Sequence, residues 1–508
     1  MPIQPARPSS SLAPIRDEDF RFSQARHLLL RAGFGGTEDQ INLLAEWGPE
    51  RAVDHMLNFG EIPSEPDRPD AFDHDIMHPL SDQDQRALRQ ARQSRNEAVV
   101  EQFQKRRMTA QRADRAQMRE IQGWWLTRMI QTPKPLEEKL TLFWHGHFAT
   151  GYRTIEDSYH MYAQNRMFRA NALGNFGTLL GNIIRDPAML RYLNNNQNRK
   201  SDPNENLARE IMELFSLGEG NYSENDIKNG ARALTGYTYN DDDFSFEMNR
   251  HDQTIKRILG VSGNLDGEGF VNAILRSRAC PAFIATKLYR FFVADVPMDI
   301  KEMPPASRQF IAKLADQLAR ANYELKPVVR KMLLSRHFYD ASVMKNKIKS
   351  PAELVVGSVR SLSTPTRNMR VLVEAMTQMG QSLFAPPSVK GWDGGRAWIS
   401  TATMFTRQNT LVYLLTGRLP AGFNPIGMAQ SFDARPLVRS LNNPARTDTP
   451  SRAHIASDLL RAVLDTRDEA LAKKIADATE HEKRDADDPR TLTEMLTLIT
   501  ALPQYQLC

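Results

Sequence analysis

The segment SDPNENLAREIMELFSLGEG, residues 201–220, predicts a helix whose two ends are both marked. Asp202 suits the N-cap, Pro203 suits the first helical position, and Glu205 lies three residues after the cap, as a capping box requires. Gly218 suits the C-cap because glycine readily adopts the left-handed conformation that ends helices. We expect this helix to lie at the centre of the fold.

Two faces of the predicted helix differ in character. An apolar stripe, expected to face the core, consists of Leu207, Ile211 and Leu214. The neighbouring polar face consists of Asn206, Glu210 and Glu213, with Arg209 beside them. Carboxylates next to an apolar stripe are expected to be partly buried, and a buried carboxylate needs a cation, a metal ion or a proton. The partners of Glu210 and Glu213 are therefore the main functional question.

A pair of histidines lies in the helical pattern at 136–151, within the motif FWHGHF. His145 and His147 are two residues apart, so on a regular helix their side chains point about 200° apart. They reach one site only if the helix frays at Gly146, and glycine does weaken a helix. Two interpretations stay open: a metal site, or one hydrogen-bonded core histidine and one surface histidine.

Residues 235–259 change to an alternating pattern, which predicts a β-hairpin near 236–259, followed at its end by a histidine and an aspartate. Carboxylate and imidazole groups together suit zinc, manganese or iron. The candidate ligands of such a divalent metal are His145, His147, Glu210, Glu213, His251 and Asp252. Asn206 and Arg209 are assigned to a structural polar network instead.

Composition is ordinary for a soluble globular protein: 508 residues, 41% hydrophobic and 25% charged, with a net charge of +5. That charge is well short of a nucleic-acid-binding signature. No apolar run approaches the roughly 18 residues of a membrane span, and the N-terminus shows no export signal, so a cytoplasmic location is the default. Two cysteines, Cys280 and Cys508, cannot make a disulfide framework.

The whole pattern predicts a mostly α fold: a large multi-helix bundle with one small β-hairpin and a C-terminal helical region. The expected parts are a disordered tail at 1–16, an N-terminal helical bundle at 17–60, an acidic loop and long basic helical insertion at 61–122, a main helical lobe at 123–424 and C-terminal helices at 425–508.

The insertion contains neither glycine nor proline from 80 to 122, which predicts one long helix. Its middle is strongly basic, as expected either of a solvated arm or of a surface for acidic partners. Few aromatic residues lie between the arginines to stack on bases, so nucleic acid is a disfavoured partner.

Two further segments carry polar and aromatic residues. The helix expected from Pro281 bears Lys287 and Arg290. The segment FAPPSVKGWDGGRAWIS, residues 384–400, predicts a rigid loop of a kind that often borders a site in enzymes. Its Trp392 and Trp398 either anchor the loop or line a pocket, and anchoring is favoured.

Several long motifs, in order along the chain, resemble a bacterial family catalogued as domain of unknown function 1800. The motifs are RHLLLRAGFGG, FWHGHF, DPNENLAREIMELFSLGEGNY, ALTGY, RHD, KIKSPAELVV, PPSVKGWDGG and LPQYQL. The resemblance implies a large helical protein and no accepted activity. It also implies that export remains open, and that a neighbouring sulfatase-like family is a candidate partner. The basic stretch at 80–120 departs from the family pattern.

The function expected from these patterns is that of a non-catalytic scaffold, or of a maturation or assembly partner for another protein. One alternative is a metal-dependent hydrolytic or oxidative enzyme with a site of histidine and glutamate. A second alternative is a binder of acidic partners through the basic arm. No nucleophile elbow, Walker loop, dinucleotide fingerprint or HExxH motif is present, which disfavours several common enzyme classes.

Overall fold

The computed structural model describes residues 10–63, 72–365, 367–418, 432–442, 450–481 and 484–508. As predicted, the fold is mostly α-helical with little β structure. None of its described helices is both long and apolar enough to span a bilayer. Residues 10–16, expected in a disordered tail, run along the body, where the Ile15 N–H donates to the Leu334 carbonyl at 2.8 Å. Residues 1–9 lie outside the described part.

The N-terminal helices are α1 (Phe22–Gly33) and α2 (Glu38–Leu57), which pack on each other. Thr37 caps α2 in a capping box, as its sequence predicts. Two separate helices were expected here, one of them beginning at Pro49. Both helical segments are present within α2, where Gly48, with a non-helical φ of 76°, separates them by a kink immediately before Pro49.

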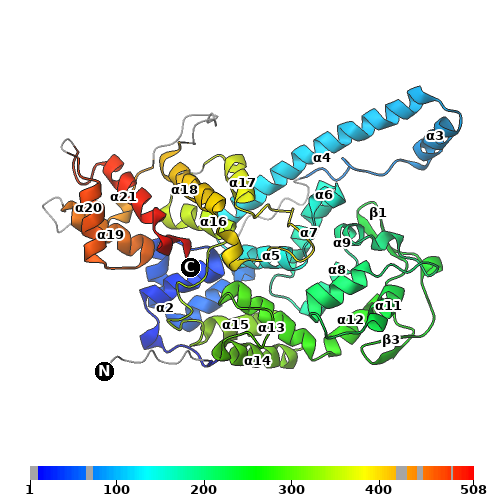
Figure 1. Cartoon of the computed structure of the whole chain (residues 1–508), viewed down its shortest axis with the longest axis horizontal. Coiled ribbons are helices and arrows are strands. Elements are labelled where there is room, and N and C mark those ends of the chain that lie inside the picture. The colour runs from blue at the N-terminus through cyan, green and yellow to red at the C-terminus, as the bar shows by residue number, and fades with distance from the viewer. Residues whose placement is uncertain (1–9, 64–71, 366, 419–431, 443–449, 482–483) are drawn as a thin grey trace.

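A helical hairpin projects from the body (Figure 1) and consists of α3 (Asp82–Gln93) and α4 (Glu97–Gln131). The prediction of one long helix is wrong at Arg95, where the backbone has a φ of 54° and reverses direction. Asn96 then caps α4 by accepting from the Val99 N–H at 3.3 Å. A polar cap can start a new helix without glycine or proline, so the lack of these residues between 80 and 122 does not require one continuous helix.

Helix α5 (Pro135–His147) lies between two hydrophobic cores. Its Leu140 and Trp144 belong to the first core, and its Leu142 belongs to the second. The first core is also built from α7 (Ser158–Ala170), α8 (Phe176–Ile183), α9 (Pro187–Tyr192), α10 (Asn206–Glu210), α11 (Glu224–Ala233), α12 (Gly267–Arg276), α13 (Ala279–Phe292), α14 (Pro305–Arg320) and α15 (Leu325–Leu334). The short α6 (Tyr152–Ile155) packs against α9.

The second core crosses the boundary that the sequence suggests near residue 425. Its helices, besides α4, are α16 (Pro351–Leu362), α17 (Met369–Gln378), α18 (Thr401–Thr416), α19 (Arg452–Leu464), α20 (Glu469–Ala478) and α21 (Pro489–Ala501). Because α18 packs directly on α21, the C-terminal helices share a core with the end of the main lobe (Figure 1).

Two antiparallel β-hairpins lie at one end of the body. The predicted one pairs β1 (Tyr237–Asn240) with β2 (Asp243–Phe246), with Tyr237 opposite Phe246. The second, which the sequence pattern did not reveal, pairs β3 (Lys256–Ile258) with β4 (Val261–Gly263). Short 3₁₀ turns occupy Asp17–Asp19, Phe59–Glu61, Asn195–Gln197, Met248–Arg250, Gly395–Trp398, Arg435–Leu437 and Pro503–Gln506.

Candidate functional site

The predicted central helix begins later than its sequence suggests. Asp202 does not cap it: its N–H closes a turn onto Arg199 at 2.9 Å, and α10 starts at Asn206. The side chain of Asn198 holds this turn by accepting from the Asn204 N–H at 2.9 Å. Turn formation by the preceding asparagines therefore outcompetes the capping box.

The second half of that helix, Ile211–Ser216, is wound as a π-helix. The Ser216 hydroxyl donates to the Ile211 carbonyl at 2.5 Å, and Gly218 ends the segment with a φ of 81°, as predicted. Short π segments inside helices recur at functional sites. This winding was not predicted, and it moves Phe215 into the core while Leu214 is only partly buried.

Glu210 and Glu213 are partly buried, as predicted, but they do not share a cation. The Tyr222 hydroxyl donates to Glu213 at 2.6 Å. Burial, together with the negative charge of Glu213, raises the pKa of Glu210. Arg209 turns to other carboxylates, Glu205 at 3.1 Å and Glu224 of α11 at 2.8 Å.

Asn206, which was assigned to the same polar network, is exposed. Its backbone N–H donates to the Asn204 side chain at 3.0 Å. The network is therefore an ion-pair cluster around Arg209 that ties α10 to α11, and Asn206 takes part in it only through its backbone turn.

His145 and His147 are both buried, so the interpretation of one surface histidine is wrong. Helix α5 continues through Gly146 and keeps the two rings on different sides. The Phe384 N–H donates to His145 Nε2 at 3.1 Å, while His147 Nε2 donates to the Phe215 carbonyl at 2.9 Å. Burial lowers the pKa of each imidazole to about 3, aided at His147 by a nearby lysine, so both rings are neutral.

His251 and Asp252 serve the loop after the first hairpin. His251 Nδ1 bonds the Thr235 carbonyl at 2.8 Å, and Asp252 pairs with Arg232 at 2.7 Å. Burial works against ionisation of Asp252, but hydrogen bonds from Arg232 and Thr254 prevail and hold its pKa below the ordinary value.

Within the described residues no three histidine, cysteine, aspartate or glutamate side chains are grouped so that they could hold a metal ion. The six predicted ligands are divided among the C-terminal end of α5, the α10 segment and the loop after β2. Most of them are engaged by backbone groups, Tyr222 or Arg232. A zinc, manganese or iron site stays a prediction that this geometry does not support.

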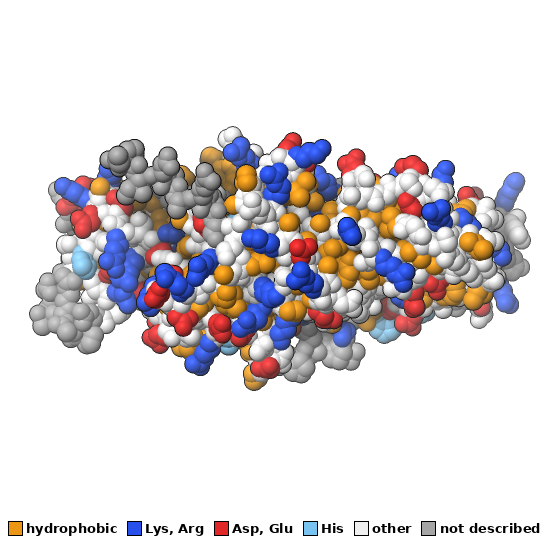
Figure 2. All heavy atoms as spheres, turned by 90° about the horizontal axis from the view of Figure 1, so that it is seen from below, with side chains coloured by type: hydrophobic (Ala, Val, Ile, Leu, Met, Phe, Trp, Pro, Cys, Tyr) orange, Lys and Arg blue, Asp and Glu red, His pale blue; other side chains and the backbone are white. Residues whose placement is uncertain are grey.

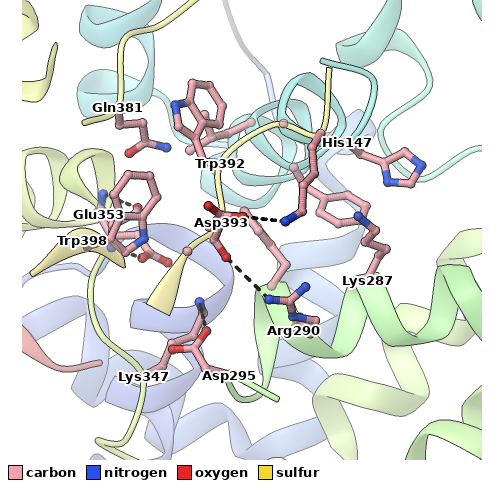
Figure 3. Close-up of a pocket in the computed structure, with 17 residues that line it drawn as sticks. His147, Lys287, Arg290, Asp295, Lys347, Glu353, Gln381, Trp392, Asp393 and Trp398 are labelled. Atoms are coloured by element: carbon pink, nitrogen blue, oxygen red, sulfur yellow. Dashed lines mark hydrogen bonds and ion pairs between the residues drawn. The ribbon is translucent and has the colours of Figure 1, made fainter. Parts of the chain in front are cut away.

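A cavity of about 130 Å³ lies beside α5 (Figure 3) and is built from four distant segments. Helix α5 contributes His147, and α13 contributes Lys287 and Arg290. The start of α16 contributes Glu353, and the loop after α17 contributes Trp392. The loop approaches closely because Gly391 has no side chain: a Cβ on Gly391 would lie 2.1 Å from the Gly146 carbonyl oxygen.

Ion pairs hold three carboxylates at this cavity. Lys139 reaches Glu353 at 2.6 Å, Lys347 reaches Asp295 at 3.3 Å, and Lys390 reaches Asp393 at 2.9 Å. The sequence had pointed to Lys287, Arg290, Trp392 and Trp398 one by one. All four line the cavity, so the tryptophans do more than anchor the loop. Their convergence could not be read from spacing, because the contributing segments are far apart in the chain.

The α3–α4 hairpin carries a second concentration of polar residues. Within the described residues, eight arginines of this hairpin are exposed and make no ion pair: Arg86, Arg89, Arg92, Arg95, Arg107, Arg112, Arg115 and Arg119. Of the ten basic residues described between 82 and 120, the other two, Lys105 and Arg106, pair with Glu101 at 2.8 Å and Asp84 at 3.5 Å.

Comparison with known proteins gives one match. The family model described as protein of unknown function, DUF1800, matches residues 27–507. No curated protein and no solved structure matches the chain significantly. The matched range includes the α10 segment, both α5 histidines and every residue that lines the cavity. On this evidence, the chain belongs to the DUF1800 family over nearly its whole length.

Proposed function

We propose that this protein is a non-catalytic partner in the maturation or assembly of another protein, and that it binds an acidic surface of that protein through the α3–α4 hairpin. The observation that carries the proposal is the set of exposed, unpaired arginines on a helical hairpin that extends away from the body (Figure 1). Exposed cations without internal partners are available to an outside carboxylate at little desolvation cost.

The charge distribution supports an acidic partner. Residues 82–120 contain ten basic and six acidic side chains, an excess of four, which is most of the net charge of +5 of the chain. On the face of the body seen in Figure 2, lysine, arginine, aspartate and glutamate are interspersed instead. A basic projection on a nearly balanced body would steer an acidic partner toward the hairpin.

The surface of the hairpin favours a protein over a nucleic acid. A hollow of about 660 Å³ runs along α4, lined by Ile76, Ala98, Ala110 and the stems of Lys105 and Arg106. Small apolar residues beside charged heads suit the side chains of a partner helix or loop. Phe103 is the one aromatic residue between 80 and 122, and the Arg106 guanidinium lies 5.7 Å from the centre of its ring, so bases find little to stack on.

The experiment compares two variants that remove the same amount of charge. R86Q/R92Q/R107Q/R112Q changes exposed arginines of the hairpin, and R467Q/K473Q/K474Q/R490Q changes exposed residues in the C-terminal helical region. Each is co-purified with the sulfatase-like protein that the family resemblance suggests as first candidate, and is cross-linked in the native host. We expect the hairpin variant to lose the partner by roughly tenfold or more, and the control variant to keep it.

Cross-links that come from the body alone, or equal partner recovery by both variants, would refute the proposal. A steep loss of affinity for DNA or RNA with salt, abolished by the hairpin variant, would replace it with nucleic-acid binding.

A further inference from the structure

The cavity beside α5 carries two cations that form no direct ion pair with a described carboxylate, although Asp295 and Asp393 lie close enough to Arg290 to oppose the lowering of its pKa by burial. Each of its three carboxylates already has a lysine: Glu353 has Lys139, Asp295 has Lys347 and Asp393 has Lys390. Lys287 and Arg290 are the remaining cations, one turn apart on α13. In the described part of the chain, neither makes an ion pair with a carboxylate.

The hydrogen-bond donors of these two side chains are largely unused. The Lys287 ammonium makes no hydrogen bond to any described residue and lies 5.2 Å from the centre of the Phe283 ring. Arg290 donates only to the Asp393 carbonyl oxygen, at a long 3.5 Å, and its Nε is buried without an acceptor among the described residues. Trp392 Nε1, from the opposite wall, is likewise buried without an acceptor there. Unsatisfied donors beside a cavity point to a ligand that supplies acceptors.

We infer that the cavity binds a doubly charged tetrahedral oxyanion, of the phosphate or sulfate kind, between Lys287 and Arg290. Two negative charges match the two cations that lack a direct ion pair. The planar fork of a guanidinium suits two oxygens of a tetrahedral group, and an ammonium adds a point charge. In Figure 3, Lys287 and Arg290 extend from α13 on one side of the pocket, and the loop brings Asp393 and Trp392 to it from another side.

The size of the cavity limits the ligand. About 130 Å³ is well below the roughly 300–1,000 Å³ of a pocket for a drug-sized ligand. A free oxyanion, or the oxyanion end of a small monoester, therefore fits. Phe143, Phe291 and Trp398 provide apolar walls that a small organic group of a monoester could contact.

The experiment measures the dissociation constants of four probes for the full-length protein by calorimetry at about pH 7.5: inorganic phosphate, sulfate, phenyl phosphate and acetate. The test variants are K287M and R290Q, which remove the charges, and W392F, which removes only the indole donor. K473M on exposed α20 is the control. Thermal unfolding of each variant without ligand verifies that it folds.

We expect at least one dianion to bind the native protein and the K473M control equally. K287M and R290Q should each weaken it roughly tenfold or more, and W392F less. Tighter binding of phenyl phosphate than of phosphate would assign the site to monoesters, and equal or weaker binding would assign it to free anions. Absence of binding by all three dianions, acetate binding as tight as theirs, or unchanged affinity in both K287M and R290Q would overturn the inference. None of these results depends on the hairpin or its partner.

Discussion

Lys139 and Glu353 form an ion pair of 2.6 Å in which the side chains are only 0% and 7% exposed, although they are 214 residues apart in sequence. Lys139 lies on α5 and Glu353 lies in the first turn of α16, where it also accepts from the Ser350 N–H at 2.7 Å. The pair joins a helix shared by both cores to the second core, immediately beside the cavity. It fixes the wall from which the neighbouring Lys347 extends.

Removing one partner of this buried pair is expected to destabilise the fold strongly. E353Q leaves the Lys139 ammonium without a counter-charge, and the loss of unfolding free energy should be about 3–5 kcal/mol. K139M should cost a similar amount, whereas K139M/E353L should cost less than the sum of the two single changes. Urea unfolding measures all three. R209Q, which breaks a half-exposed cluster, is the comparison and should cost about 1 kcal/mol or less.

The same pair predicts an acid transition. Burial opposes ionisation of Glu353, but the attraction of Lys139 and Lys347 outweighs it and lowers the pKa from 4.5 to about 2. A depressed carboxyl pKa contributes stability that is complete above about pH 4.5 and is lost as the pH falls toward 2. Stability of the native protein should therefore fall in that window, and the fall should be smaller in E353Q. Parallel acid titrations of the two proteins would disprove this assignment.

The titration of Lys287 predicts that anion binding weakens at high pH, whereas the stability contributed by Glu353 is lost at low pH. Burial, with help from Arg290 and Lys390, lowers its pKa from 10.5 to about 8; His147 of α5 and Asp393 of the loop also line the cavity. Sulfate affinity should be level below about pH 8 and fall above it, by up to roughly tenfold per pH unit, as the ammonium loses its proton. K287R should keep its affinity over the same range, because a guanidinium stays charged. A native profile as flat as that of K287R would exclude Lys287 from the site.

Much of the fold could be predicted because the residues at the start of each helix determine where it begins. The capping boxes at Thr37 and Ser223 begin α2 and α11. The π segment could not be predicted. The carbonyl of its Phe215 accepts a hydrogen bond from His147, on a helix 68 residues earlier in the chain, and no local pattern encodes that contact.

The candidate site was harder to predict than the helices. The spacing of Glu210 and Glu213 predicted that they lie on one face and are partly buried. Both are partly buried in the structure. The spacing could not reveal that Tyr222 satisfies Glu213, or that Lys287 would be left without a carboxylate. A site formed by four segments depends on tertiary packing, so its residues were noted separately without being joined.

Gly391 and Gly394 provide a matched test of how the loop is positioned at the cavity. Both have a positive φ, 83° and 78°, but only Gly391 would place a Cβ against backbone, since nothing lies within 4 Å of a Cβ at Gly394. G394A should cost about 1–2 kcal/mol of backbone strain and leave the loop in contact with α5. G391A should cost about 3 kcal/mol or more and weaken anion binding, because the loop must move off α5. Equal stabilities and affinities of the two variants would contradict the close contact with Gly146.

The neutral histidines of α5 predict a second loss of stability, which begins at higher pH than that of Glu353. Burial lowers the pKa of His147 from 6.5 to about 3, with a contribution from Lys287. Below about pH 6.5 His147 therefore binds a proton in the unfolded chain but not in the folded chain. Its contribution to the free energy of unfolding is complete above this pH and declines below it. Between about pH 7.5 and pH 5 each such histidine should cost about 2 kcal/mol of unfolding free energy.

H147Q can still donate to the Phe215 carbonyl and should reduce this pH dependence by that amount, whereas H454Q, at an exposed position, should leave it unchanged. Urea unfolding at the two pH values measures the change in unfolding free energy for each protein. If that change is as large in H147Q as in the native protein, His147 is protonated in the folded state.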